Sequence, residues 1–104
     1  MQIFYNKPSP RLVMDKLLEI VRRAIERYNR YRSPEAFAKL VKAEGDRVIV
    51  EFSGSFCRSC GVYDWLEDLV YELKEVDPGY EARLIAWSEI AEERIVAEFE
   101  VKRL

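Results

Sequence analysis

Apolar side chains recur at intervals of three and four residues along two stretches of the chain, which is the spacing of one face of a helix. The two stretches are residues 11–32 and residues 57–76. A further helix is predicted over residues 34–44, because Ser33 is a good N-cap and Pro34 suits the first helical position. The pattern therefore predicts three helices.

Four other stretches have the character of strands. In residues 94–102 apolar and charged side chains alternate, which indicates a strand with one face in the core and one in water. Residues 47–52 are apolar on both faces except for Glu51, which is typical of a covered strand. Shorter runs at residues 2–6 and 80–87 complete the set.

The order of these elements is β-α-α-β-α-β-β, which predicts one α/β domain over residues 1–104. Strands separated by helices favour parallel crossover connections. The last two strands have only a short link between them, so we expect them to pair antiparallel. The prediction is a four-stranded mixed sheet that is mostly parallel.

The amino-acid composition excludes several kinds of catalytic and metal-binding site. The 104 residues include two cysteines and no histidine, which excludes Cys–His and Ser–His–Asp catalysis and any histidine-containing zinc site. No apolar run approaches the roughly 20 residues of a membrane span, and charged residues near the start leave no secretory signal. We therefore expect a cytoplasmic protein with no cofactor and no membrane contact.

The residues best suited to a chemical function are Cys57 and Cys60, which lie where a predicted strand is followed by a predicted helix. Two cysteines with this spacing on one helix would lie one turn apart, close enough to form a disulfide. The helix N-terminus and the charge of Arg58 would favour a thiolate at Cys57. The pattern therefore indicates thiol–disulfide exchange.

The same region resembles thioredoxin-fold proteins, in which an acid-bearing strand is followed after four residues by C-x-x-C. Here Val48-Ile49-Val50-Glu51-Phe52 is followed by residues 53–56 and then by the cysteines. The resemblance covers residues 34–87. It implies that Cys57 is the attacking thiol, Cys60 the resolving thiol and Glu51 a buried acid beneath them, with Phe56 and Arg58 contacting the substrate.

Around this core the chain departs from the family. Residues 1–33 add a strand and a long helix in front, and residues 88–104 add a final strand in place of the family's cis-proline hairpin and terminal helix. A weaker resemblance is to the NifU C-terminal domain, an iron–sulfur scaffold that also has C-x-x-C after a glycine-containing turn.

Two other interpretations of the cysteines stay open. Gln occurs once and Asn twice while Arg and Glu abound, which suggests a thermophile, and intracellular proteins of hyperthermophiles do use structural disulfides. A static disulfide in an interaction module is therefore one alternative. The other is a dimer in which paired C-x-x-C motifs hold a metal ion or an iron–sulfur cluster, although no site within one chain is predicted.

The expected partners are protein thiols or disulfides and a second copy of the chain. Residues 1–47 carry a net charge of +5 and residues 48–104 a net charge of −7, which would suit a homodimer. We expect an exposed apolar surface that includes Phe56 and could extend to Trp87. Phe56 and the cysteine end of the helix would then lie at or near the dimer interface. The arginines of residues 22–32 share their helix with Asp15, Glu19 and Glu26, so an ion-paired face is favoured over nucleic-acid binding.

Overall fold

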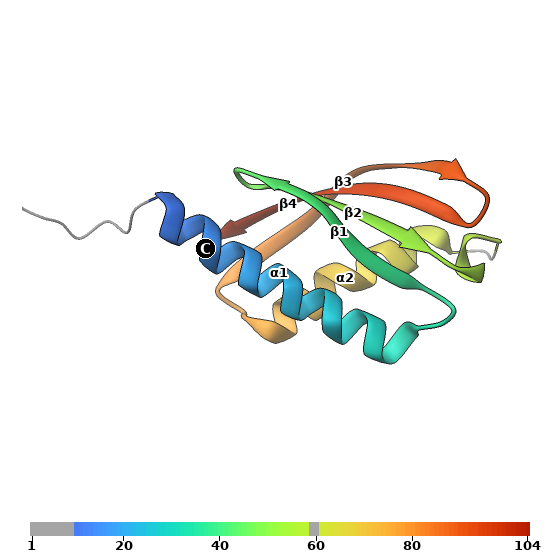
Figure 1. The fold of residues 1–104 in the computed structure, drawn as a ribbon. Coiled ribbons are helices and arrows are strands. Elements are labelled where there is room, and N and C mark those ends of the chain that lie inside the picture. Colours follow the sequence, from blue (N-terminus) through green and yellow to red (C-terminus); the bar gives the residue numbers. More distant parts are fainter. Residues whose placement is uncertain (1–9, 59–60) are drawn as a thin grey trace, which may run out of the picture.

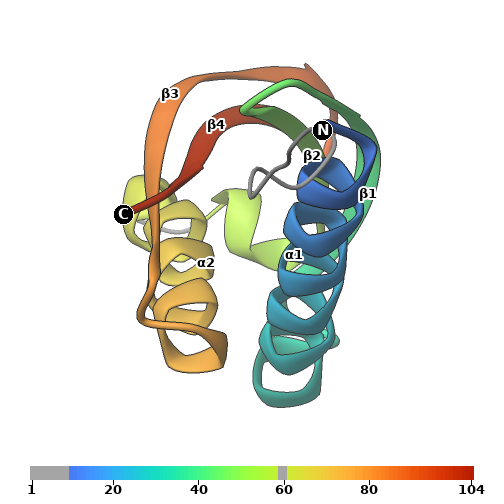
Figure 2. The same ribbon diagram turned by 90° about the vertical axis from the view of Figure 1, so that its left-hand side faces the viewer.

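The computed structural model describes residues 10–58 and 61–104, with the backbone alone described for residues 10–14, 57 and 58. Within these residues the chain forms two layers, a four-stranded sheet and two helices that cover one of its faces (Figure 1). Figure 2 shows the sheet curving over the two helices, which lie beneath it side by side. The α/β class is confirmed, while the predicted strand over residues 2–6 lies outside the described residues.

Both helices bury one apolar stripe, as their spacing predicts. Helix α1 spans Pro10–Arg32, close to its predicted bounds. Helix α2 spans Val62–Val76 and starts later than predicted, because Gly61 takes a left-handed conformation with φ of 85° that a helix interior does not accept. Cys57 belongs instead to a separate 3-10 turn, η1, over Ser55–Arg58.

The strands form two hairpins, each following a helix. Strands β1 (Phe37–Glu44) and β2 (Arg47–Ser53) follow α1, and β3 (Tyr80–Ala91) and β4 (Arg94–Arg103) follow α2. The sheet order is β1-β2-β4-β3, so the second strands of the two hairpins meet in the middle. The described chain is thus a helix–hairpin unit that occurs twice in succession.

The prediction of a mostly parallel sheet is wrong, since every neighbouring pair of described strands is antiparallel. The physical reason is that each hairpin closes through a turn of two residues, and only antiparallel strands can be joined that way. The antiparallel pairing predicted for the last two strands is confirmed.

The helix predicted over residues 34–44 is also wrong, because this segment forms strand β1. Its alanines, lysines and leucine favour a helix, but Gly45, with φ of 63°, turns the chain back so that β1 pairs with β2. Asn29 of α1 then accepts a hydrogen bond from the Ala38 N–H at 2.7 Å and donates one to its carbonyl at 3.0 Å. Tertiary contacts outweigh local propensity here.

Alternation along the two central strands separates the core from the open face of the sheet. The inward positions of β4 are the predicted ones, and together with those of β2 they are buried: Val48, Val50, Phe52, Ile95, Ala97, Phe99 and Val101. The opposite positions carry cross-strand ion pairs such as Arg47–Glu98 at 2.7 Å. Among the described residues, neither helix is long and apolar enough to cross a membrane.

Candidate functional site

The segment with the cysteines connects β2 to α2 at one end of the two layers. Cys57 lies in η1, whereas Cys60 lies outside the described residues. Because α2 begins at Val62 with Gly61 as its N-cap, the expectation that Cys57 opens this helix is wrong. The helix macrodipole acts within about the first turn, so it gives no reason for a thiolate at Cys57.

Backbone hydrogen bonds fix the chain just before Cys57. The Gly54 N–H donates to the Glu93 carbonyl at 3.1 Å, which joins this turn to the tip of the β3–β4 hairpin. The Phe56 N–H donates to the Glu35 carbonyl, also at 3.1 Å, which joins it to the loop between α1 and β1. The residues leading to Cys57 therefore have a defined backbone position.

Phe56 anchors this turn in the core. Its side chain is 2% exposed and lies between Phe52 of β2, with ring centroids 6.4 Å apart, and Trp65 of α2 at 5.7 Å. The expected role of Phe56 in binding substrate at an exposed surface or dimer interface is therefore wrong. The physical reason is that the turn from β2 into η1 points this ring beneath the sheet, where it closes the end of the core.

Glu51 is not a buried acid, so this expectation is wrong as well. Phe52 faces the helices, and the residue before it, Glu51, must face the opposite side of the sheet. There Glu51, 22% exposed, accepts a hydrogen bond from the Arg94 Nε at 2.9 Å. The hydrogen bond and charge of Arg94 lower the pKa of the Glu51 carboxyl. It is therefore an ionised surface group and not a proton relay.

Removing the Glu51 charge should affect stability only slightly. A carboxyl with a lowered pKa stabilises the fold above its unfolded pKa of about 4.3, and this contribution is lost as the pH falls through the lower folded value. We expect Glu51→Gln to reduce the free energy of unfolding by less than about 1 kcal/mol at neutral pH, as for other surface pairs. Urea denaturation at neutral and strongly acidic pH measures this, and a difference that grows on acidification would contradict it.

Gly54 is the residue that sequence reasoning missed. Its φ of 131° is a conformation that side chains disfavour, and an added Cβ would collide with the Glu35 carbonyl. The sequence contains Ser53-Gly54-Ser55, but nothing in it shows that residues 34–35 pass against this turn. Gly54 thus allows the α1–β1 loop to approach the base of η1.

We expect Gly54→Ala to lower the free energy of unfolding by about 2 kcal/mol, because backbone strain adds to the collision. Gly45→Ala is the matched control, since Gly45 also has a positive φ but nothing lies within 4 Å of its added Cβ. Chemical denaturation of both variants compares them. An effect at Gly54 no larger than that at Gly45 would show that the close approach to Glu35 is unimportant.

Arg58 was expected to bind substrate, and its backbone lies at the end of η1, while its side chain is outside the described residues. Trp87, by contrast, is exposed as expected, at 42%. It lies on the edge strand β3. The structure thus places Cys57 and Phe56 together in η1 and separates Glu51 and Trp87 from them onto the sheet.

The opposite charges of the two halves meet inside the chain. Glu72 of α2 is 3% exposed and accepts hydrogen bonds from Arg27 and Arg32 of α1, both at 2.9 Å. Arg32 also contacts Asp68 at 3.2 Å and lies 4.7 Å from the centre of the Tyr28 ring. These contacts hold α1 against α2. They involve arginines of the segment that we had considered as a surface for a nucleic acid or a neighbouring chain.

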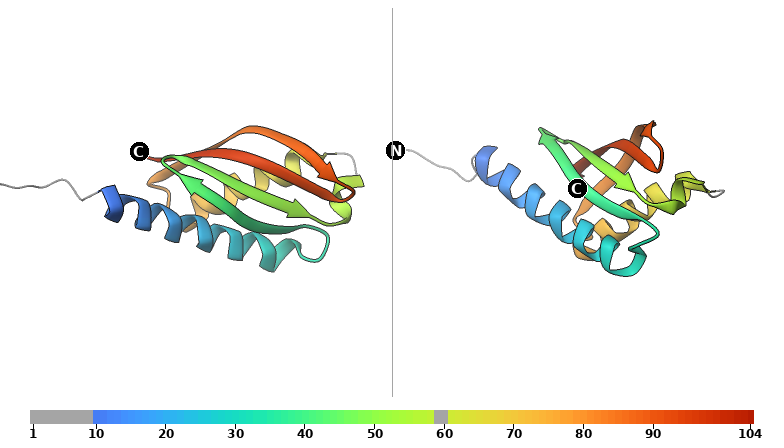
Figure 3. Two further views of the ribbon diagram at one scale, coloured as in Figure 1. Left: turned by 45° about the horizontal axis from the view of Figure 1, so that its top comes forward. Right: turned by 45° about the vertical axis from the view of Figure 1, so that its right-hand side comes forward.

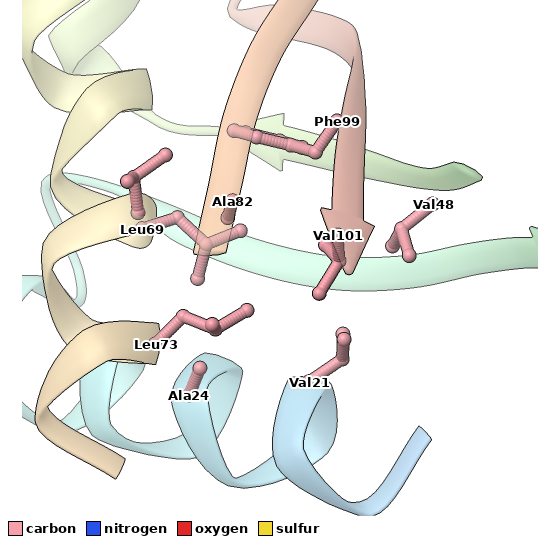
Figure 4. Close-up of a pocket in the computed structure, with 9 residues that line it drawn as sticks. Val21, Ala24, Val48, Leu69, Leu73, Ala82, Phe99 and Val101 are labelled. Carbon is pink, nitrogen blue, oxygen red and sulfur yellow. The ribbon is translucent and has the colours of Figure 1, made fainter. Parts of the chain in front are cut away.

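The cavity between the helices and the sheet is too small for a ligand (Figure 4). This cavity holds about 10 Å³ and is lined by apolar side chains such as Val21, Leu69 and Phe99. A volume of this size admits roughly one water at most, and an apolar lining offers it no hydrogen-bond partner. The described residues also contain no group of three acidic, cysteine or histidine side chains that could hold a metal ion.

The sequence places Cys57 in the η1 turn and Cys60 two residues after its end. Comparison of the chain with protein-family models, with curated proteins and with solved structures finds no match in any of the three.

Proposed function

We propose that this chain is a small cytoplasmic thiol–disulfide protein that uses Cys57 and Cys60 to exchange electrons with protein thiols or disulfides. The observation that supports this most is how the four-residue C-x-x-C segment is bounded. The residue directly before it, Phe56, is buried in the core, and Gly61 directly after it is the N-cap of α2. A four-residue segment held at both ends would limit how far its two cysteines can separate, which would favour reversible exchange.

The chemistry is a two-step exchange. The thiolate of one cysteine attacks a disulfide sulfur of the partner, which forms a mixed disulfide and releases one partner thiolate. The second cysteine then attacks the mixed disulfide and releases the other partner thiolate. The partner gains two electrons, and the chain ends with a Cys57–Cys60 disulfide that another cellular dithiol returns to the reduced state.

Protons in this exchange pass to solvent in our proposal. Glu51 carries a lowered pKa and faces the open side of the sheet, so it is unsuited to relaying a proton. Arg58 follows Cys57 directly in the sequence, and its positive charge would favour the thiolate. The assignment of Cys57 as the attacking thiol rests on the thioredoxin resemblance.

Alkylation rates of the single variants Cys57→Ser and Cys60→Ser test this assignment. We expect the thiol of Cys57 to react with iodoacetamide with an apparent pKa below the value of about 8.5 for a free thiol, and below that of Cys60. The reverse order would exchange the two roles. Apparent pKa values near 8.5 for both thiols would contradict exchange chemistry at this site.

Metal analysis of the same purified protein separates exchange from the cluster-binding alternative. The proposal predicts two titratable thiols for each chain after mild reduction, and less than one metal ion or iron–sulfur cluster for every two chains. A stoichiometric metal or cluster that is lost on substitution of either cysteine would replace this proposal with a binding function.

A further inference from the structure

Strand β3 forms one edge of the sheet (Figure 3, left). Several apolar side chains along it are exposed. Ile85, Trp87 and Ile90 are 37%, 42% and 50% exposed. Ile85 and Ile90 are extra residues at irregularities in the pairing with β4. A long apolar edge whose outer backbone groups have no neighbouring strand is a template for pairing with another strand.

The other edge, strand β1, is protected in two ways. The Asn29 side chain occupies the N–H and the carbonyl of Ala38, and Lys39 and Lys42 place positive charges along the strand. Lysines on an edge strand oppose strand addition. By contrast, β3 holds a single basic residue, Arg83, which is neutralised by Glu100 at 2.9 Å. Of the two described edges, β3 is the one without lysines, although the extra residues Ile85 and Ile90 interrupt its regular pairing.

We propose that a second copy of this chain pairs with β3, edge to edge and antiparallel, about a two-fold axis between Ile85 and Ala86. The pairing of β3 with β4 decides which residues share a face. Leu84 lies opposite Phe99 and Trp87 lies opposite Ala97, and both partners on β4 are buried beneath the sheet. Leu84 and Trp87 therefore project to the same side, with Ile85 as the extra residue between them.

This register makes β3 complementary to itself. Leu84 meets the partner's Trp87 on the helix side, and the two-fold axis repeats the contact, so four apolar side chains gather there. Arg83 meets the partner's Ser88 on the open side, and Ala82 meets the partner's Glu89. No like charges face each other, which is what a second copy requires of an isologous interface.

The association stops at two copies. Pairing through β3 leaves only the two β1 strands as edges of an eight-stranded sheet, and both are protected as described above. The dimer is therefore closed, and strands do not add further along the sheet.

The proposed dimer also determines the distance between the two η1 turns. Each residue of a strand advances it by about 3.3 Å, so the end of β3 at Ala91 lies about 18 Å from the axis, and the two ends lie roughly 36 Å apart. The Gly54–Glu93 hydrogen bond joins the turn before Cys57 to this end. The two η1 turns, each with its Cys57 backbone, thus lie at opposite ends of the dimer, which argues against a metal ion shared between the two copies.

Sedimentation equilibrium of the full chain across micromolar concentrations tests the interface independently of any redox activity. We expect a wild-type dimer and an increase of about 30-fold or more in its dissociation constant for Trp87→Lys and for Ile85→Lys. Tyr71→Lys is the matched control, because Tyr71 is 59% exposed but lies on α2 and not on the pairing strand, so this variant should leave the dimer intact.

Circular dichroism checks that each variant is folded. Because the side chains of Ile85 and Trp87 are already exposed, a lysine at either position should leave the core intact, so loss of the dimer in both variants would be due to the interface. A wild-type monomer at a concentration of tens of micromolar would overturn the proposal. So would a dimer that persists in both β3 variants, or one that dissociates equally in Tyr71→Lys.

Discussion

Phe56→Ala should lower the free energy of unfolding by about 3–5 kcal/mol, the usual cost of removing a large buried aromatic side chain. The ring is 2% exposed and packs against Phe52 and Trp65, so its removal leaves a cavity between β2 and α2. Phe56 is also the residue directly before Cys57. We therefore expect faster amide hydrogen exchange at residues 54–58, beyond what the lower global stability produces.

Tyr63→Ala provides the control for this prediction. Tyr63 is also aromatic and lies on α2, but it is 54% exposed, so its loss should change stability by about 0.5 kcal/mol or less. Urea denaturation of both variants gives the comparison. If Phe56→Ala cost no more than Tyr63→Ala, the ring would not close the core, and the argument that it anchors the cysteine segment would fail.

The second large effect is expected at Glu72, the buried carboxylate between the helices. Glu72→Gln keeps the shape of the side chain but removes the charge that faces Arg27 and Arg32. Removal of one partner from a buried ion pair costs about 3–5 kcal/mol. We expect about 3 kcal/mol, because Arg32 keeps its contact with Asp68 and the side chain of Arg27 is one-third exposed.

Glu75→Gln is the matched control, because Glu75 is an exposed acidic residue on the same helix. Its substitution should change the free energy of unfolding by about 0.5 kcal/mol or less. Chemical denaturation at low and high salt adds a second readout, since a buried pair is screened much less than a surface pair. Equal costs for the two glutamates would mean that the network does not hold α1 against α2.

How much of the fold the sequence predicts depends on the strength of each local pattern. Residues 11–32 have a long helical periodicity and residues 94–102 a strict alternation, and both elements are found close to their predicted bounds. Residues 34–44 contain residues that favour a helix, and nothing within this segment indicates which distant strand it pairs with. The two-residue turn Gly45-Asp46 is a hairpin signal that precedes a clear strand, and it could have corrected this prediction.

The candidate site was harder to predict because it depends on which face of β2 is covered. The alternation of Val50, Glu51 and Phe52 already places Glu51 opposite Phe52. The sequence suggested that both faces were covered, whereas both helices lie on the Phe52 side. Gly54 could not have been found in this way, since its constraint comes from Glu35, which is distant in sequence.

The reduction potential of the Cys57–Cys60 disulfide tests the central claim most directly. The protein would be equilibrated in glutathione redox buffers, quenched by rapid alkylation and analysed by mass spectrometry. Our account predicts a reversible disulfide within one chain, with a potential between about −270 and −120 mV, the range of exchange proteins. A disulfide that stays oxidised below about −300 mV would be structural, and either that result or no disulfide in oxidising buffer would contradict the account.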